Sequence, residues 1–249
     1  MELFDILITI GIGLVAGFIN TLAGSGSLLT LPLLMFMGLP ANVANGTNRI
    51  AILLQNVVGV SSFKQQKVFD FKEGIWLAIP AIIGSVVGAQ LAVDLNAVLM
   101  KQFIGGLLVF MFFFILIKPE RWIKQKEDIK SKPDIWQIII FFFIGIYGGF
   151  IQAGVGFFLL AGLVVGAGFD LVKANAVKVF IVLLYTAFAL AVFIINHQVN
   201  YLVGFVLAIG NMTGAYIATR LAVKKGSGFV RIILLAALFI SSAKLFGLF

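Results

Sequence analysis

Long apolar segments, separated by short polar stretches, run along almost the entire chain. Their approximate limits are residues 4–22, 27–38, 43–63, 74–93, 98–117, 135–154, 157–168, 172–195, 202–221 and 229–247. Eight of these segments are long enough to cross a hydrocarbon core of about 30 Å, which takes about 20 helical residues. The segments 27–38 and 157–168 are too short, because a helix of about twelve residues reaches only about 18 Å. The pattern predicts an all-α polytopic membrane protein with eight full spans and two short broken helices.

The composition supports the membrane class independently of the segment limits. Hydrophobic residues make up 61% of the 249 residues and charged residues only 11%, and the mean hydropathy is +1.13. Soluble domains carry about 25% charged residues. A soluble fold with this composition would lack the polar surface that it needs in water, so that class is excluded.

A polar stretch at 118–134 divides the chain near its middle, and motifs on one side of it recur on the other. The matching pairs, in order, are GFIN (17–20) with GFIQ (149–152), AGSGSLLTLP (23–32) with AGVGFFLLAG (153–162), VANGTN (43–48) with KANAVK (173–178), and GSVVGA (84–89) with GNMTGA (210–215). The offset stays between 126 and 132 residues. The chain is therefore predicted to contain an N-terminal membrane repeat (1–117), a basic cytoplasmic linker (118–134) and a C-terminal membrane repeat (135–249).

The net charge of +8 comes from basic residues that concentrate on one face of the membrane. Because that pattern is explained by membrane topology, we expect no nucleic-acid partner. If all ten segments cross, 14 of the 18 basic residues face the cytoplasm and two face outward. If the two short segments are re-entrant loops instead, four basic residues between 220 and 231 face outward, against the positive-inside rule. The first topology is favoured. It places both termini outside and gives the halves opposite orientations, an inverted repeat of the kind found in many secondary transporters.

Pairs of glycines four residues apart occur at equivalent places in both halves. They are Gly13/Gly17, Gly84/Gly88, Gly145/Gly149 and Gly210/Gly214. In membranes such pairs let two helix backbones approach closely. We expect them to mark helix contacts rather than ligand contacts.

Two interruptions, at 23–27 and 153–157, are rich in small residues and lie at matching positions of the halves. Unpaired backbone at membrane depth is tolerated only inside protein or along a polar cavity, and matched interruptions are typical of transporter binding sites. A short helix that begins near Ser25 or Val155 would direct free N–H groups and a partial positive charge at a ligand, which suits an anion. The alternative is a tight turn between two helices.

Two cationic residues, Arg49 and Lys178, lie one to two turns inside apolar segments. Cations at that depth are usually paired or functional. Since no acidic residue lies deep in any segment, a small anionic substrate is the expected partner. Snorkelling of Lys178 toward the cytoplasmic interface is the alternative. The full set of predicted substrate-binding residues is Asn20, Ser25, Ser27, Asn45, Thr47, Asn48, Arg49, Gln152, Asn175 and Lys178.

Catalytic and metal-binding motifs are missing from the sequence. It contains no cysteine, no HExxH and no paired carboxylates within the segments, and its one histidine, His197, falls in a short loop. We therefore expect no metal, no cofactor and no enzymatic activity.

Two stretches carry a family resemblance. GFINTLAGSGSLLTLPLL followed by GLPANVANGTNRIA, and GGFIQAGVGFFLLAGLV followed by ANAVKV, resemble the TauE/SafE family of sulfite and organosulfur-anion exporters. The resemblance implies a multi-pass permease in the plasma membrane of a prokaryote, with a sulfur-containing anion and the lipid bilayer as partners. Export by alternating access is the favoured hypothesis. The alternatives are ion-coupled import of a sulfur compound and a non-transporting assembly subunit, and a homodimer is left open.

Overall fold

The computed structural model of the protein describes residues 2–68, 71–116 and 134–245, and the side chains of 71–73, 108–116 and 234–245 are left out. All regular elements in these ranges are helical. The helices are α1 (Leu3–Ala23), α2 (Ser27–Phe36), α3 (Ala41–Gln65), α4 (Phe71–Val93), α5 (Ala97–Leu116), α6 (Ile135–Phe150), α7 (Val155–Ala161), the π-helix η2 (Gly162–Gly166), α8 (Leu171–Ile195) and α9 (Tyr201–Leu245). Of the predicted linker, 118–133 lies outside the described residues.

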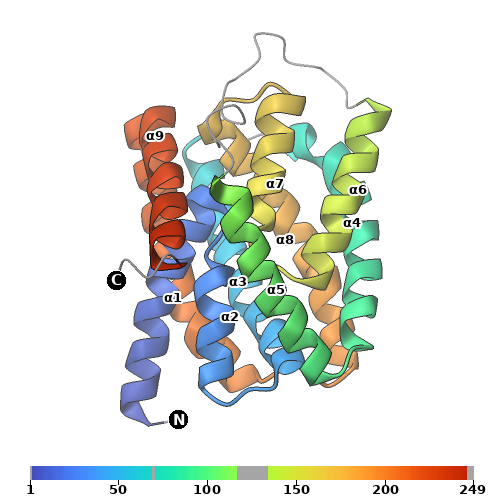
Figure 1. The fold of residues 1–249 in the computed structure, drawn as a ribbon. Coiled ribbons are helices and arrows are strands. Elements are labelled where there is room, and N and C mark those ends of the chain that lie inside the picture. The colour runs from blue at the N-terminus through green and yellow to red at the C-terminus, as the bar shows by residue number, and fades with distance from the viewer. Residues whose placement is uncertain (1, 69–70, 117–133, 246–249) are drawn as a thin grey trace.

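The helices follow the predicted apolar segments closely. The two short segments appear as α2 and as α7 with η2, and Figure 1 shows α2 running toward the lower end of the bundle and α7 toward the upper end. Within the described ranges, four stretches are long and apolar enough to cross a membrane: Leu3–Ala23, Gly74–Val93, Leu171–Ile195 and Tyr201–Ile233. The prediction of an all-α, multi-pass membrane protein is confirmed. The total of eight spans stays a prediction.

Helix α3 is as long as α8, at 25 residues, but it carries many polar side chains. Those of Asn45, Asn48, Arg49 and Gln55 are buried against neighbouring helices. Polar groups at membrane depth are stable only with such protein partners. Helix α3 is therefore less apolar than α8 because it supplies many of the buried polar side chains of the bundle.

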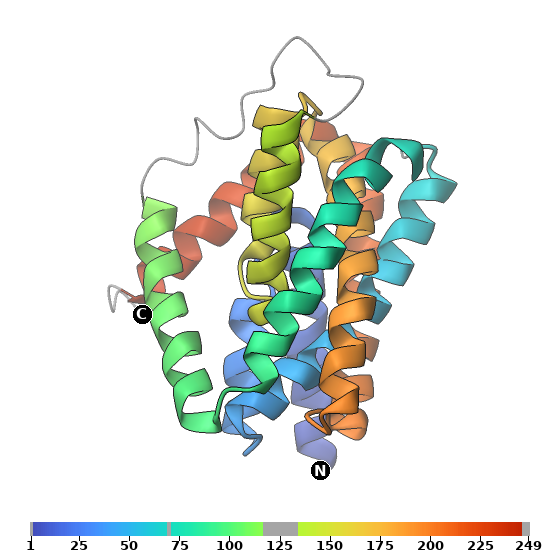
Figure 2. The same cartoon turned by 90° about the vertical axis from the view of Figure 1, so that its right-hand side faces the viewer.

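Helix α9 contains a reversal at Gly226, where φ is 75° and ψ is −174°. Glycine adopts this left-handed φ without the clash that a Cβ would cause. The predicted segments 202–221 and 229–247 are the two arms on either side. Figure 2 shows the last part of the chain running back across the bundle from its upper end.

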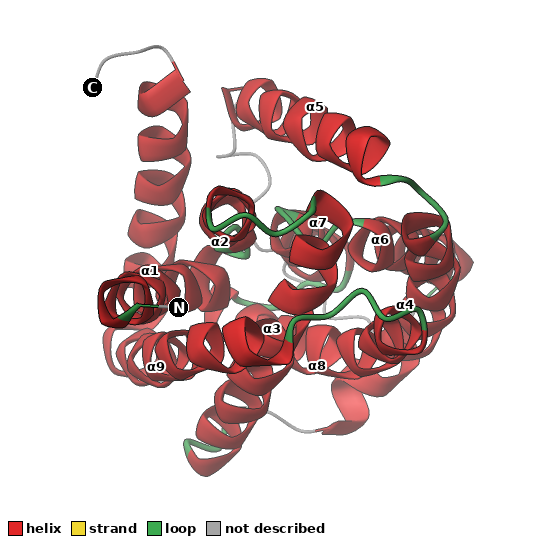
Figure 3. Cartoon of the chain, turned by 90° about the horizontal axis from the view of Figure 1, so that it is seen from below, coloured by secondary structure: helices red, strands yellow, loops and turns green. Residues whose placement is uncertain are grey.

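The two halves of the chain are packed into each other. Helix α1 packs along α9, and α6 packs along α4, while α3 and α8 contact each other. Seen along the bundle, α3 and α8 lie between α9 and α4, with α2 and α7 beside them and α5 outermost (Figure 3). Each broken helix is therefore held by a long helix from the other half.

The glycine pairs lie in these helix contacts, as predicted. A Cβ added at Gly17 would overlap the backbone of Asn211 on α9, and one added at Gly149 would overlap the backbone of Ser85 on α4. The other members of the four pairs meet backbone atoms of the facing helix in the same way. Close backbone approach replaces the hydrophobic driving force that lipid does not supply.

Candidate functional site

The break after α1 and the break before α7 are in contact. Gly24 and Gly154 have left-handed φ values of 78° and 74°. The backbone N–H of Gly156 donates to the carbonyl oxygen of Gly24 at 3.3 Å. A Cβ added to either Gly24 or Gly156 would overlap the Cα of the other. The two interruptions found in the sequence therefore form a single meeting point of two glycine backbones.

Helix α2 begins beside this meeting point with unused donors. Ser25, Gly26 and Ser27 are buried, and their backbone N–H groups donate no hydrogen bond within the described ranges. The first N–H groups of a helix have no acceptor in the helix itself, and they carry the positive end of its dipole. The start of α2 therefore suits a negatively charged group.

Arg49 of α3 reaches the carboxyl end of the broken helix α6. Its guanidinium donates to the backbone carbonyls of Gly148 at 3.1 Å and Gly149 at 2.5 Å, and to Oε1 of Gln152 at 3.4 Å. The ring centroid of Phe193 lies 4.6 Å from its Cζ. The Nε of Arg49 has no partner in the described part of the chain, so one donor of this fully buried cation is unused there.

Lys178 of α8 does the same for the carboxyl end of the broken helix α1. Its Nζ donates to the backbone carbonyls of Thr21 at 2.7 Å and Asn20 at 3.2 Å, and to Oδ1 of Asn175 at 2.6 Å. Only 2% of Lys178 is exposed. Its Nζ is therefore directed into the protein and not toward the surface.

The two cations are neutralised only in part. The last carbonyls of a helix carry the negative end of its dipole, about half an elementary charge. Among the buried polar residues of the described ranges there is no Asp or Glu. In their protonated forms, Arg49 and Lys178 are thus opposed by partial charges only.

A polar network surrounds the end of α1. The Nδ2 of Asn20 donates to Oε1 of Gln55 at 3.3 Å, and the Nδ2 of Asn211 donates to the same oxygen at 3.1 Å. The Oδ1 of Asn211 accepts no hydrogen bond from any residue that the structure describes. Helices α1, α3 and α9 are tied together by these amides.

A matching network surrounds the end of α6. The Nε2 of Gln152 donates to the hydroxyl of Tyr185 at 2.7 Å, and the hydroxyl of Ser85 donates to the backbone carbonyl of Tyr185 at 3.2 Å. Gln55 and Tyr185, and likewise Asn211 and Ser85, are related by the same sequence offset as the repeated motifs. Helices α8 and α4 thereby hold the segment that follows α6.

The remaining predicted residues contact the start of α2, the end of α6 or the segment ahead of α9. The Nδ2 of Asn48 donates to the hydroxyl of Ser27 at 3.2 Å, which fixes the start of α2. Asn45 donates to the carbonyl of Phe150 at 2.8 Å, beside Arg49. Thr47 faces elsewhere, since its hydroxyl accepts the backbone N–H of Asn200 ahead of α9. The structure thus places Arg49, Gln152 and Asn45 at the end of α6 and Lys178, Asn175 and Asn20 at the end of α1. Asn48 and Ser27 meet at the start of α2, next to Ser25, and Thr47 belongs to none of these groups.

The sequence analysis did not select Gln55, Asn211, Ser85 or Thr30. Thr30 donates to Oδ1 of Asn48 at 2.7 Å. These four residues are polar positions within apolar segments, and all four are buried. The repeat offset could have found Gln55, because it aligns with Tyr185.

The family follows from comparison with known proteins. The family model described as "Sulfite exporter TauE/SafE" matches residues 9–245. The chain belongs to the TauE/SafE family. The resemblance seen in its motifs is therefore confirmed, and the protein is a member of a membrane transporter family.

Relatives of this TauE/SafE protein are similar over almost their full lengths. "Probable membrane transporter protein ORF9" of Sinorhizobium sp is 28% identical over 217 residues, covering 87% of this chain and 83% of its own. The Haemophilus influenzae "Probable membrane transporter protein" is 26% identical over 236 residues, covering 94% and 91%. "Probable membrane transporter protein YfcA" of Escherichia coli K12 is 28% identical over 236 residues, covering 94% and 87%. No solved structure matches this TauE/SafE chain at a significant level.

Proposed function

We propose that this TauE/SafE protein carries a small sulfur-containing anion, such as sulfite or an organosulfonate, out of a prokaryotic cell across the plasma membrane. One observation carries the proposal. Two buried cations, Arg49 and Lys178, cap the carboxyl ends of the broken helices α6 and α1, and the start of α2 has unused N–H groups beside the contact between the two breaks. No buried carboxylate is found among the described residues.

The proposed substrate-binding residues are those around this meeting point. Arg49 and Lys178 supply the charge, and the N–H groups and hydroxyls of Ser25 and Ser27 supply hydrogen bonds to anion oxygens. Gln152, Asn20, Asn45, Asn48 and Asn175 hold these groups in place. Such fixed donors stabilise an anion more strongly than water does in a site of low dielectric constant.

The transport cycle is proposed to be alternating access between two inverted repeats, 1–117 and 135–249. The support is the reciprocal packing. Helix α1 lies against α9 and α6 lies against α4, and a cation of each half caps the broken helix of the other. With eight full spans, two short helices and both termini outside, rocking of one half against the other would open the site to either side in turn.

Export has a favourable driving force. One negative charge that leaves a cell with an inside-negative potential gains about 2.3 kcal/mol per 100 mV. Import of an anion would need coupling to an ion gradient. A non-transporting assembly subunit remains the alternative from another class, and it would need no buried, partly neutralised cations.

The test is anion flux from liposomes that hold the purified protein under an imposed potential. We expect sulfite efflux to rise with inside-negative potential, and Arg49→Gln to abolish it, while Lys101→Gln, at an exposed position of α5, leaves it unchanged. Flux that ignores the potential would contradict electrogenic export. Full flux in a folded Arg49→Gln protein would remove Arg49 from the site.

Binding identifies the anion separately. Ligands of the folded state raise its apparent stability by RT ln(1 + [L]/Kd). Thermal-shift measurements with sulfite, sulfate, sulfoacetate and taurine should show the largest shift for the true substrate. A neutral thio compound that outperforms every anion would overturn the proposed substrate class.

A further inference from the structure

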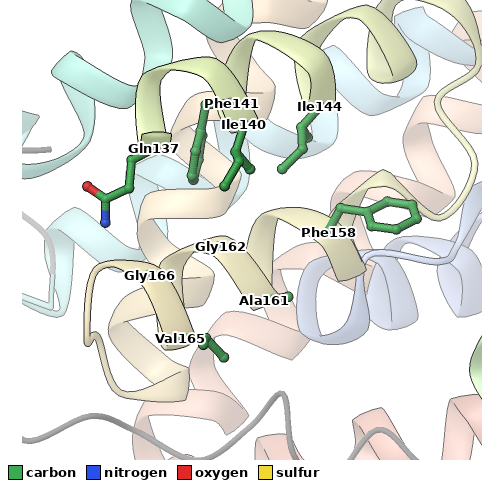
Figure 4. A pocket seen from close by; sticks show the side chains of 9 residues that line it. All are labelled: Gln137, Ile140, Phe141, Ile144, Phe158, Ala161, Gly162, Val165 and Gly166. Atoms are coloured by element: carbon green, nitrogen blue, oxygen red, sulfur yellow. The ribbon is translucent and has the colours of Figure 1, made fainter. Parts of the chain in front are cut away.

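A cavity of about 510 Å³ lies between α6 and the segment formed by α7 and η2. Its walls are mainly apolar, and they are formed by residues that include Ile140, Phe141, Ile144, Phe158 and Val165. Figure 4 shows these side chains between the two segments, with Gln137 at one end. Cavities of this size commonly hold organic ligands. Because the walls carry no charge, the cavity is unsuited to a small anion and is distinct from the central site.

Among the described residues that line this cavity, Gln137 has the one polar side chain, and the nitrogen of its amide is unused. Its Oε1 accepts the backbone N–H of Asp134 at 3.1 Å in the capping box that begins α6. Its Nε2 has no hydrogen-bond partner among the described residues, although only 6% of the residue is exposed. Buried donors are almost always paired, so an unpaired one needs an explanation. An acceptor on a ligand would satisfy it.

Glycines on the facing wall let η2 approach the side chains of α6 closely. A Cβ at Gly162 would come within 2.9 Å of the Phe141 ring, and one at Gly166 would come within 3.4 Å of the Gln137 Nε2. Both glycines belong to the π-helix η2, and π-helical turns occur frequently at functional sites.

The cavity lies next to a surface that faces lipid. Trp136 and Phe143 on α6 are 69% and 61% exposed, and Ile140, which lines the cavity, is 48% exposed. Tryptophan is enriched at the level of the lipid headgroups. Gln137 follows Trp136 in the first turn of α6, so its free amide lies near the depth at which apolar chains join the polar part of a lipid.

We propose that this cavity binds one ester-linked acyl chain of a membrane phospholipid, whose ester carbonyl accepts a hydrogen bond from Nε2 of Gln137. The acyl chain would extend along Ile140, Phe141 and Ile144. A lipid there would lie between α6 and the segment formed by α7 and η2. Helix α6 is also the helix whose carboxyl end Arg49 caps. Occupancy would therefore limit the movement of α6 relative to α7, whichever anion is carried.

The test compares two phosphatidylethanolamines that differ only in ester or ether linkage of identical chains. Native mass spectrometry of the full chain in mild detergent measures how much of each is retained. We expect the ester lipid to be retained several-fold more than the ether lipid, because the ether lacks the carbonyl acceptor. Equal retention of the two lipids, or retention of neither, would overturn the proposal.

Two variants locate the lipid. Gln137→Glu keeps the oxygen that accepts from Asp134 and removes the donor, so we expect it to erase the ester preference. Ala161→Phe fills the cavity and should abolish retention. Gly106→Phe is the matched control, because it fills a second cavity of about 520 Å³ between α5 and α6 and a Cβ there meets no atom within 4 Å. An unchanged ester preference in folded Gln137→Glu, or loss of it in Gly106→Phe, would contradict the assigned place.

Discussion

The Nζ of Lys178 donates to the backbone carbonyl of Thr21 at 2.7 Å, so a cation of the second half caps the broken helix of the first. Arg49 makes the reciprocal contact with Gly149 on α6. Under the proposed function, each cation would both cap a helix and bind the anion, which would link binding to the packing of the two halves. The predictions below separate these two roles.

Replacing Lys178 with Met should remove both roles at once. The side chains are similar in length, but Met cannot donate to the carbonyl of Thr21 or to Oδ1 of Asn175, and each buried acceptor left unpaired costs about 1–3 kcal/mol. We expect a lower thermal unfolding midpoint and loss of anion-induced stabilisation. Lys101→Met, at an exposed position, is the control for loss of charge. Anion-induced stabilisation that persists in Lys178→Met would show that Lys178 is only a structural cap.

Alanine at Gly156 should disrupt the meeting point of the two breaks. Its Cβ would overlap the Cα of Gly24, and overpacking costs about 1–3 kcal/mol. Alanine at Gly24 adds the penalty of a left-handed φ, about 1–2 kcal/mol. Gly38→Ala is the control for that penalty, because Gly38 follows the end of α2 with a φ of 88° and a Cβ there meets no atom within 4 Å. The unfolding midpoint should be highest for Gly38→Ala, lower for Gly156→Ala and lowest for Gly24→Ala, and any other order would contradict the steric argument.

Gln55→Glu tests the sign of the site's charge with little change in shape. The new carboxylate can still accept from Asn20 and Asn211, but it adds a negative charge to the cluster. We expect anion affinity to fall by about tenfold or more, which corresponds to about 1.4 kcal/mol. Gln102→Glu, at an exposed position, should leave affinity unchanged. Titration of the thermal shift with sulfite measures both, and equal affinities would contradict an anion site near Gln55.

Tyr185→Phe should weaken transport more than it weakens the fold. The hydroxyl of Tyr185 holds Gln152, which in turn accepts from Arg49. Loss of one hydrogen bond costs about 1 kcal/mol of stability, while the freed Gln152 no longer positions Arg49. We expect a several-fold higher KM for anion flux. Tyr216→Phe, on the exposed surface of α9, serves as the control, and the same KM in both variants would remove Tyr185 from the network.

Much of the local structure could be predicted from the sequence. The apolar segments and the breaks at Gly24 and Gly154 follow from composition, because glycine and serine interrupt helices and apolar runs extend them. Arg49 and Lys178 could be identified as buried cations from their depth alone. The roles of Gln55 and Asn211 could not, because a lone amide in a helix does not reveal its partner.

The sequence by itself determined the class of protein, the order of its helices and the positions where they break, since these depend on hydropathy and on backbone preferences within a few residues. Only the tertiary structure decided that Gly24 touches Gly156 and that Arg49 and Lys178 are held by carbonyls of the opposite half. Every residue has a carbonyl, so only the packing of distant helices selects the ones that a buried cation will meet. It also placed the unused amide of Gln137 beside an apolar cavity, which no single helix could form.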